Sequence, residues 1–233
     1  GVLSGAMGNR RGPPKRKPLF FGKESGALYF EEEPIFSCLT AAACATEETE
    51  SVSGDSYSFL ETDDSVAMIL SDGVGSGESA ARDSGRIVDL TERILDAGLG
   101  PDMAMLFLNG MAGAEGDENR MATLDLCRID LYRGECETVK AGGAAGFIKR
   151  SDRVEKIQSR QLPLGMSASE DISEKKWQLN SGDLVILVSD GVVQNWPCGD
   201  GEYLLEQKIA SLNVSSPVDL ANLILRYAIR QCG

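Results

Sequence analysis

The chain has 233 residues, a formal net charge of −13 and a pI of about 4.5. This acidity argues against a nucleic acid partner, because basic patches supply most of that affinity, and against binding to an anionic membrane surface. The sequence contains no histidine, which excludes catalytic sites of the Ser-His-Asp and Cys-His types. A metal site would have to use carboxylates and water, ligands that suit hard ions such as Mg²⁺ or Mn²⁺.

The six cysteines form no Cys-x-x-Cys pair, so we expect free thiols in a reducing cytosol rather than disulfides or zinc ligands. No apolar run approaches the roughly 20 residues that cross a bilayer. The sequence therefore predicts a cytoplasmic domain that inserts no segment of its own into a membrane.

Residues 1–22 are expected to form a flexible basic tail, within which residues 5–8 look like a cloning remnant. Between residues 9 and 18, five lysine and arginine side chains lie among prolines, which is typical of a solvated, extended segment. A partner-binding arm is the alternative interpretation. The folded domain is expected over residues 23–233, with a clear strand between Ile35 and Ala45.

A β-hairpin is predicted over residues 57–70, with its turn at Asp63-Asp64. From residue 77 to residue 98 the apolar residues recur at helical spacing, and Pro101 opens a second helix.

The stretch 122–157 is rich in strand signals, and Trp177 precedes a further apolar strand, Leu184–Val188. Two amphipathic helices are predicted over residues 203–209 and 218–229. Because strands and helices are grouped rather than alternating, the pattern favours an α+β fold.

Two of the predicted strands end in the same three residues, Ser-Asp-Gly, which place Asp72 and Asp190 at the strand exits. Asp55 lies at a turn 17 residues before Asp72, a spacing that suits a hairpin returning to the same edge. If the two strands lie side by side in a sheet or a sandwich, the three carboxylates converge at one rim. They would repel one another there unless divalent cations were bound, and a pair of such ions can activate water and hold phosphate oxygens.

The glycine-rich loop from Gly73 to Gly77 joins a strand to a helix, so a nucleotide-binding protein is an alternative. Its glycine spacing departs from the dinucleotide pattern, and Asp72 would repel phosphate. Close backbone packing is therefore the preferred interpretation. Gly73 would in addition present a bare backbone carbonyl to a metal ion.

Several segments, in order, resemble PPM-type (metal-dependent, protein phosphatase 2C-like) serine/threonine phosphatases, most closely the phosphatase domain of stage II sporulation protein E. The likeness covers about residues 35 to 232. It is carried by residues 53–58, 66–78, 122–126, 129–131, 142–150, 162–165 and 182–191. The resemblance implies a four-layer α-β-β-α sandwich of two mostly antiparallel sheets flanked by helices, with a two-metal site at one end of the sheets.

The resemblance also implies roles for the predicted site residues. Asp72 would bridge two divalent cations, Mn²⁺ or Mg²⁺, and the carbonyl of Gly73 would touch one of them. Asp190 would bind the other ion, and Asp55 would act directly or through water. Water bound to the metal would attack phosphoserine or phosphothreonine in line, so Asp72 and Asp190 would be catalytic through that water. The helix from Ser76 to Ala97 resembles a regulatory switch and is expected to control metal occupancy.

The expected substrate is a phosphorylated protein, an anti-anti-sigma factor, which would link the domain to sporulation and sigma factor regulation in a membrane-anchored parent. The oligomeric state stays open between a monomer and a homodimer.

The family carries a further aspartate before a final strand, whereas this sequence stops at Gly233. The domain is therefore expected to lack its C-terminal strand and to be weakly active or inactive. The alternative function is a catalytically inactive phosphatase fold that regulates a partner by binding it.

Overall fold

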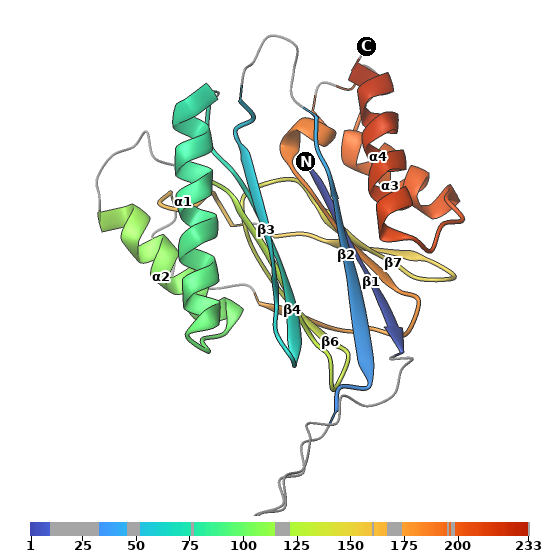
Figure 1. The fold of residues 1–233 in the computed structure, drawn as a ribbon. Helices are drawn as coiled ribbons and strands as arrows, with labels where there is room; N and C mark the ends of the chain where they lie inside the picture. Colours follow the sequence, from blue (N-terminus) through green and yellow to red (C-terminus); the bar gives the residue numbers. More distant parts are fainter. Residues whose placement is uncertain are drawn as a thin grey trace, which may run out of the picture.

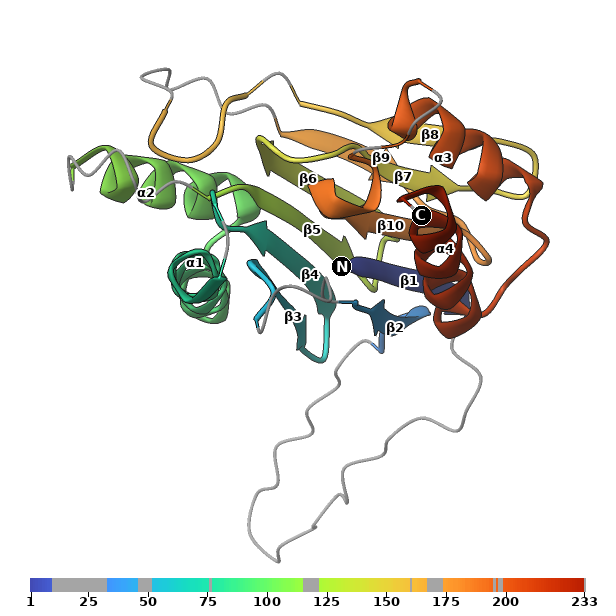
Figure 2. The same cartoon turned by 90° about the horizontal axis from the view of Figure 1, so that it is seen from above.

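The computed structural model describes residues 1–9, 33–45, 52–75, 77–114, 122–159, 161–166, 174–194, 196 and 199–232. Within this part of the chain, two five-stranded antiparallel sheets stack face to face, and a pair of helices covers each outer side (Figures 1 and 2). The α+β class and the α-β-β-α order of layers that the sequence predicted are confirmed.

The first sheet has the strand order β2-β1-β10-β7-β8. Its strands are β1 (Val2–Asn9), β2 (Phe36–Ala43), β7 (Gly146–Lys149), β8 (Val154–Ile157) and β10 (Leu184–Val188). Helices α3 (Gly201–Ser211) and α4 (Pro217–Cys232) pack on its outer face, where they bury residues such as Phe147 and Ile224.

The second sheet has the strand order β3-β4-β5-β6-β9. Its strands are β3 (Asp55–Glu61), β4 (Ser65–Asp72), β5 (Leu124–Asp130), β6 (Glu135–Ala141) and β9 (Lys175–Gln178). Helices α1 (Gly77–Asp96) and α2 (Pro101–Ala114) cover its outer face around Ile69 and Leu108.

Residues 2–9 differ from the expectation of a flexible tail, which is wrong for this segment. They form β1, a central strand of the first sheet that pairs with both β2 and β10. Val2 is buried on the helix side, and Leu3 and Met7 are buried between the sheets. The small residues around Gly5 hid this alternation in the sequence. The remainder of the predicted tail, residues 10–22, lies outside the described residues.

The alternation of side chains along β4 determines where the carboxylate of Asp72 points. Val66, Met68 and Leu70 join the apolar cluster between the two sheets, while Ala67 and Ile69 face the helices. Side chains of a strand alternate between its faces, so Asp72 continues the row that points toward the other sheet. The end of β4 thus delivers a carboxylate to the rim of the sandwich.

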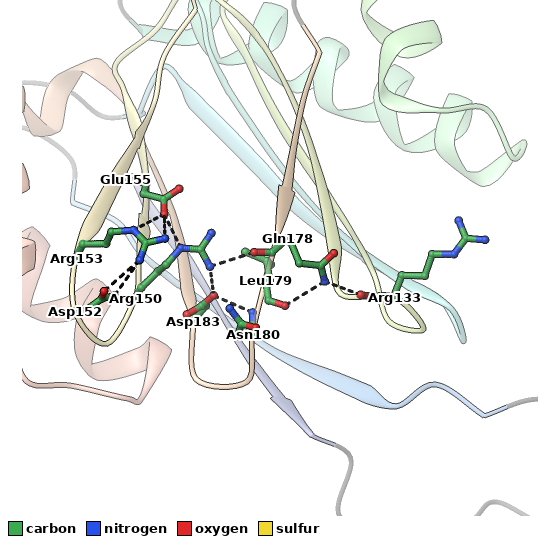
Figure 3. Close-up of polar contacts among 9 residues, drawn as sticks. All are labelled: Arg133, Arg150, Asp152, Arg153, Glu155, Gln178, Leu179, Asn180 and Asp183. Atoms are coloured by element: carbon green, nitrogen blue, oxygen red, sulfur yellow. Dashed lines mark hydrogen bonds and ion pairs between the residues drawn. The ribbon is translucent and has the colours of Figure 1, made fainter.

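Arg150 links the β7–β8 hairpin to the turn that leads into β10 (Figure 3). Its guanidinium donates to the carboxylates of Glu155 (2.7 Å) and Asp183 (2.6 Å) and to the carbonyl oxygen of Gln178 (3.1 Å). Only 10% of the Arg150 side chain and 7% of the Asp183 side chain are exposed. The network lies at the start of β10, the opposite end of that strand from Asp190, so it serves the fold by fixing where β10 begins.

Candidate metal centre

Asp55 and Asp72 face each other at one end of the second sheet. They are direct cross-strand partners at the start of β3 and the end of β4, on the face that points toward the first sheet. Like charges placed directly opposite on one sheet face are destabilising. The two carboxylates therefore repel each other and destabilise this end of the sheet, and a bound cation would offset that repulsion.

The backbone around Asp72 is held by the residue that leads into β5. The Asp72 amide donates to the hydroxyl of Thr123 (3.0 Å), and the Thr123 amide donates to the Asp72 carbonyl oxygen (2.8 Å). The hydroxyl of Ser71 donates to the Thr123 carbonyl oxygen at 2.7 Å. These bonds fix the direction in which the Asp72 carboxylate leaves the sheet.

Asp190 reaches the same end of the sandwich from the first sheet. Strand β10 ends at Val188, and Asp190 opens the short 3₁₀ helix η1 (Asp190–Val192). Between them, the Ser189 hydroxyl donates to the Asp55 carboxylate at 2.7 Å, which ties the two sheets together. The two Ser-Asp-Gly strands thus belong to different sheets and meet across the sandwich, one of the two arrangements that the sequence allowed.

Burial and neighbouring charges change the ionisation of Asp72 and Asp190. The pKa of Asp72 is raised to about 7, mainly by burial and in addition by the charges of the Asp55 and Asp190 carboxylates. Burial also raises the pKa of Asp190, although the positive charge of Lys140 opposes this. Acids that ionise reluctantly because they are buried beside one another are suited to binding a cation.

Gly73 follows Asp72 where α1 packs closest to β4. A Cβ atom at this position would lie 2.2 Å from the carbonyl oxygen of Ala80, so only glycine fits without movement of the backbone. Gly75 and Gly77 adopt positive φ angles of 97° and 74°, which favours close packing and turning as the role of this glycine-rich loop. The role of the Gly73 carbonyl as a metal ligand stays a prediction.

The donor set fits hard divalent cations in its chemistry, since it offers carboxylates and a backbone carbonyl. Among the described residues, no three acidic or thiol side chains are grouped as one ion would require. Asp55 instead accepts hydrogen bonds from the Ser189 hydroxyl and from the backbone nitrogen of Gly1. Cation binding would therefore exchange these hydrogen bonds for metal coordination.

The sequence reasoning missed a buried ion pair beside these carboxylates. Asp125 in β5 and Lys140 in β6 are paired, and each is almost fully buried. The available signal was a single charged residue within each of two otherwise apolar stretches, residues 124–126 and 139–141.

Two stacked antiparallel sheets between layers of helices, with carboxylates gathered at one end, define the protein phosphatase 2C-like fold class. The chain belongs to the stage II sporulation protein E (SpoIIE) family, whose model matches residues 62–233. It is 34% identical over 193 residues to stage II sporulation protein E of Bacillus subtilis (strain 168), a match that covers 82% of this chain and 23% of that relative. The chain thus spans about a quarter of the relative's length.

The structure resembles the solved phosphatase domain, with a fragment of the regulatory domain, of the cell fate determinant SpoIIE from Bacillus subtilis. The two chains are 33% identical, with a TM-score of 0.75 over 81% of this chain and 57% of the other. A more distant relative is the phosphoserine phosphatase RsbU of Bacillus subtilis (strain 168), 24% identical over 145 residues that cover 61% of this chain and 43% of RsbU.

None of the helices in the described part of the chain combines the length and the hydropathy that a membrane crossing demands.

Proposed function

We propose that this chain is a phosphatase domain that hydrolyses phosphoserine or phosphothreonine on a protein, with two divalent cations, Mn²⁺ or Mg²⁺, at the acidic end of the sandwich. The observation that carries the proposal is the placement of Asp72 opposite Asp55, within electrostatic range of Asp190 from the other sheet. Membership of the SpoIIE family and the likeness to a phosphoserine phosphatase support the same activity.

Each residue of the site has a proposed part. Asp72 would bridge the two ions, with the carbonyl oxygen of Gly73 on one and the carboxylate of Asp190 on the other. Asp55 would act directly or through a water molecule. When bound, the ions would lower the pKa of a water molecule and neutralise phosphate oxygens. The hydrogen bonds of Thr123 to the backbone of Asp72 would keep the bridging carboxylate in place during the attack.

The proposed substrate is a phosphorylated anti-anti-sigma factor, and the proposed setting is the cytoplasmic part of a membrane-anchored parent. Support comes from the resemblance to SpoIIE and RsbU.

The activity is tested by phosphate release from a phosphoserine peptide and from a phosphorylated anti-anti-sigma factor, with and without Mn²⁺. Asp72→Asn and Asp190→Asn are each expected to lower the Mn²⁺-dependent rate at least about a hundredfold, because each variant removes a ligand charge. Asp89→Asn, an exposed change in α1, should leave the rate unaltered. The anti-anti-sigma factor is expected to be the faster substrate.

Equal release by the wild type and by both ligand variants would contradict the metal mechanism. If the wild type takes up Mn²⁺ but releases no phosphate from either substrate, the alternative of an inactive, partner-binding phosphatase fold is favoured. Equal rates on the two substrates would remove the support for an anti-anti-sigma factor as the specific target.

We also propose that α1 controls metal occupancy. The hydroxyl of Ser84 in α1 donates to the carbonyl oxygen of Gly54 at 2.6 Å, one residue before Asp55. One turn earlier, the backbone of Ala80 packs against Gly73. The helix therefore contacts the backbone of both strands that carry the paired carboxylates, and a small shift of α1 would move them.

Ile87 and Leu90 line a cavity of about 30 Å³ between α1 and α2. Ile87→Ala and Leu90→Ala are expected to change the Mn²⁺ concentration for half-maximal activity several-fold, because they loosen α1 without altering a ligand. Ile94→Ala, farther along the same helix, should lower the melting temperature without that change. If the Ile87 and Leu90 variants only lower the melting temperature, the regulatory role of α1 loses its support.

A further inference from the structure

The short helix η1, which begins at Asp190, has few bonds of its own to hold its shape. The amides of Val193 and Gln194 donate to the carbonyl oxygen of Asp190 at 3.0 and 2.9 Å. Hydrogen bonds in a 3₁₀ helix are poorly aligned, so a single turn of this kind is easily distorted. The backbone of Asp190 sets the direction in which its side chain leaves the chain. Whatever holds η1 in place therefore also orients the Asp190 carboxylate.

Trp196 supports η1 from the side of the helices. Trp196 is buried, with 7% exposed, and its indole nitrogen donates to the carbonyl oxygen of Val192 at 3.0 Å. Val192 and Trp196 belong to the apolar cluster that the first sheet forms with α3 and α4. A buried indole N–H group requires an acceptor, and here the acceptor is the last residue of η1.

The two C-terminal helices fix Trp196 in turn. Its ring meets the ring of Tyr227 in α4 edge to face, with centroids 5.4 Å apart and planes at 82°. The ammonium group of Lys208 in α3 lies 5.1 Å from the centre of the Tyr227 ring. Aromatic pairs and cations over rings attract each other beyond the effect of the area that they bury. A continuous series of contacts thus runs from α3 and α4 through Trp196 to η1.

Helix α3 also touches the residue that follows η1. A Cβ atom on Gly201, the first residue of α3, would lie 2.1 Å from the carbonyl oxygen of Val193. The first turn of α3 therefore rests directly on this carbonyl group, while Trp196 bonds to the one before it. Because both groups are in contact with the helical layer, η1 cannot shift without disturbing it.

We propose that Trp196 is a positioning residue that holds η1, and with it the Asp190 carboxylate, in the orientation that binds a divalent cation. This inference rests on the proposed function, in which Asp190 is a metal ligand. Trp196 acts only through the backbone of η1. Without the indole N–H group, the Val192 carbonyl loses its partner and the turn is held less well. Groups that bond directly to a ligand contribute about 10- to 100-fold to metal affinity, so we expect about fivefold from a group one step removed.

The test compares the wild type with Trp196→Phe, which keeps an aromatic ring in the cluster but has no N–H group. Titration calorimetry is expected to show Mn²⁺ binding weakened about fivefold. Hydrogen exchange of the Val193 and Gln194 amides, followed by NMR on metal-free protein, is expected to be about tenfold faster, because the turn opens more often. The amides of β4 should keep their wild-type rates, which separates a local loosening from a general loss of stability.

Trp177→Phe is the matched control. Trp177 is the other tryptophan of the chain, and its indole nitrogen donates to the hydroxyl of Thr138 at 3.1 Å. Through the paired strands β9, β6 and β5 it lies level with Val66 at the start of β4, whereas Asp72 ends that strand. The control variant should lower the melting temperature but leave the Mn²⁺ affinity and the exchange of both amides as in the wild type.

Tyr227→Leu provides a second variant, which removes the ring beside Trp196 and leaves the indole in place. It should show the same two changes in smaller measure, and it decides the question if Trp196→Phe does not fold. Wild-type Mn²⁺ affinity in Trp196→Phe, or wild-type exchange of Val193 and Gln194, overturns the inference. An equal loss of affinity in Trp177→Phe overturns it as well. If the wild type itself binds no Mn²⁺, the proposed function fails, whereas the metal-free exchange still supports or overturns the hold of Trp196 on η1.

Discussion

Replacing Gly73 with alanine is expected to lower the free energy of unfolding by about 3 kcal/mol, at the upper end of the usual cost of overpacking. The added Cβ atom would lie 2.2 Å from the carbonyl oxygen, 2.6 Å from the carbonyl carbon and 2.7 Å from the Cα atom of Ala80. All three are backbone atoms of α1, so no side-chain rotation relieves the overlap. The helix would have to move away from β4, which strains the hydrogen bond from Ser84 to Gly54.

Urea denaturation measures this effect, and Gly110→Ala in α2 is the matched control. Gly110 is exposed, and a Cβ atom there would meet nothing within 4 Å. That variant is expected to raise the free energy of unfolding by about 0.5 to 1 kcal/mol, because alanine is the better helix former. The two substitutions should therefore act with opposite sign. Wild-type stability in Gly73→Ala would contradict the close approach of α1 to β4.

Without metal, the free energy of unfolding is expected to fall as the pH rises from about 4 to about 7. The pKa of Asp72 is about 7 in the folded protein, mainly because of burial, against an ordinary value of 3.8. Between these values the folded protein keeps a proton that the unfolded chain has released, so each rise in pH favours unfolding. Because Asp72 is only partly buried, solvent screening keeps this loss well below the roughly 4 kcal/mol that about 1.4 kcal/mol per pKa unit would give. Asp190 and Asp125, whose pKa values are also raised by burial, act in the same direction.

Denaturation curves in EDTA between about pH 4.5 and pH 8 test this dependence. Asp72→Asn carries no charge at any of these pH values, so it should reduce the slope and be more stable than the wild type at the alkaline end. Asp89→Asn, an exposed change in α1, should keep the wild-type slope. A wild-type stability that stays level or rises across this range would show that the carboxylates are not forced together as the structure places them.

The elements around the site could be predicted closely because their local patterns are strong. Strand β4 is apolar from Val66 to Leu70 and ends in a polar Ser-Asp-Gly sequence, so its exit at Asp72 is visible without a structure. The same holds for β10 and Asp190. Helix α1 begins at Gly77, where the apolar period changes, and ends at Asp96, two residues before Gly98.

Features that depend on long-range pairing could not be predicted in this way. Which sheet receives each Ser-Asp-Gly strand is decided by partners far away in the sequence. The burial of Asp125 and Lys140 depends on the pairing of β5 with β6, which brings the two opposite charges together. The burial of Leu3 is likewise set by neighbours that its own segment does not specify.

The central position of β1 in its sheet determines what deletion of the N-terminal residues would do. Among the described strands, β2 forms its sheet ladder only with β1, so deleting residues 1–9 would remove the backbone pairing of β2 in this sheet. The same deletion would leave the edge of β10 that pairs with β1 without a partner strand. Open strand edges beside an apolar interior are templates for pairing between molecules. A variant that lacks residues 1–9 would therefore be prone to aggregate.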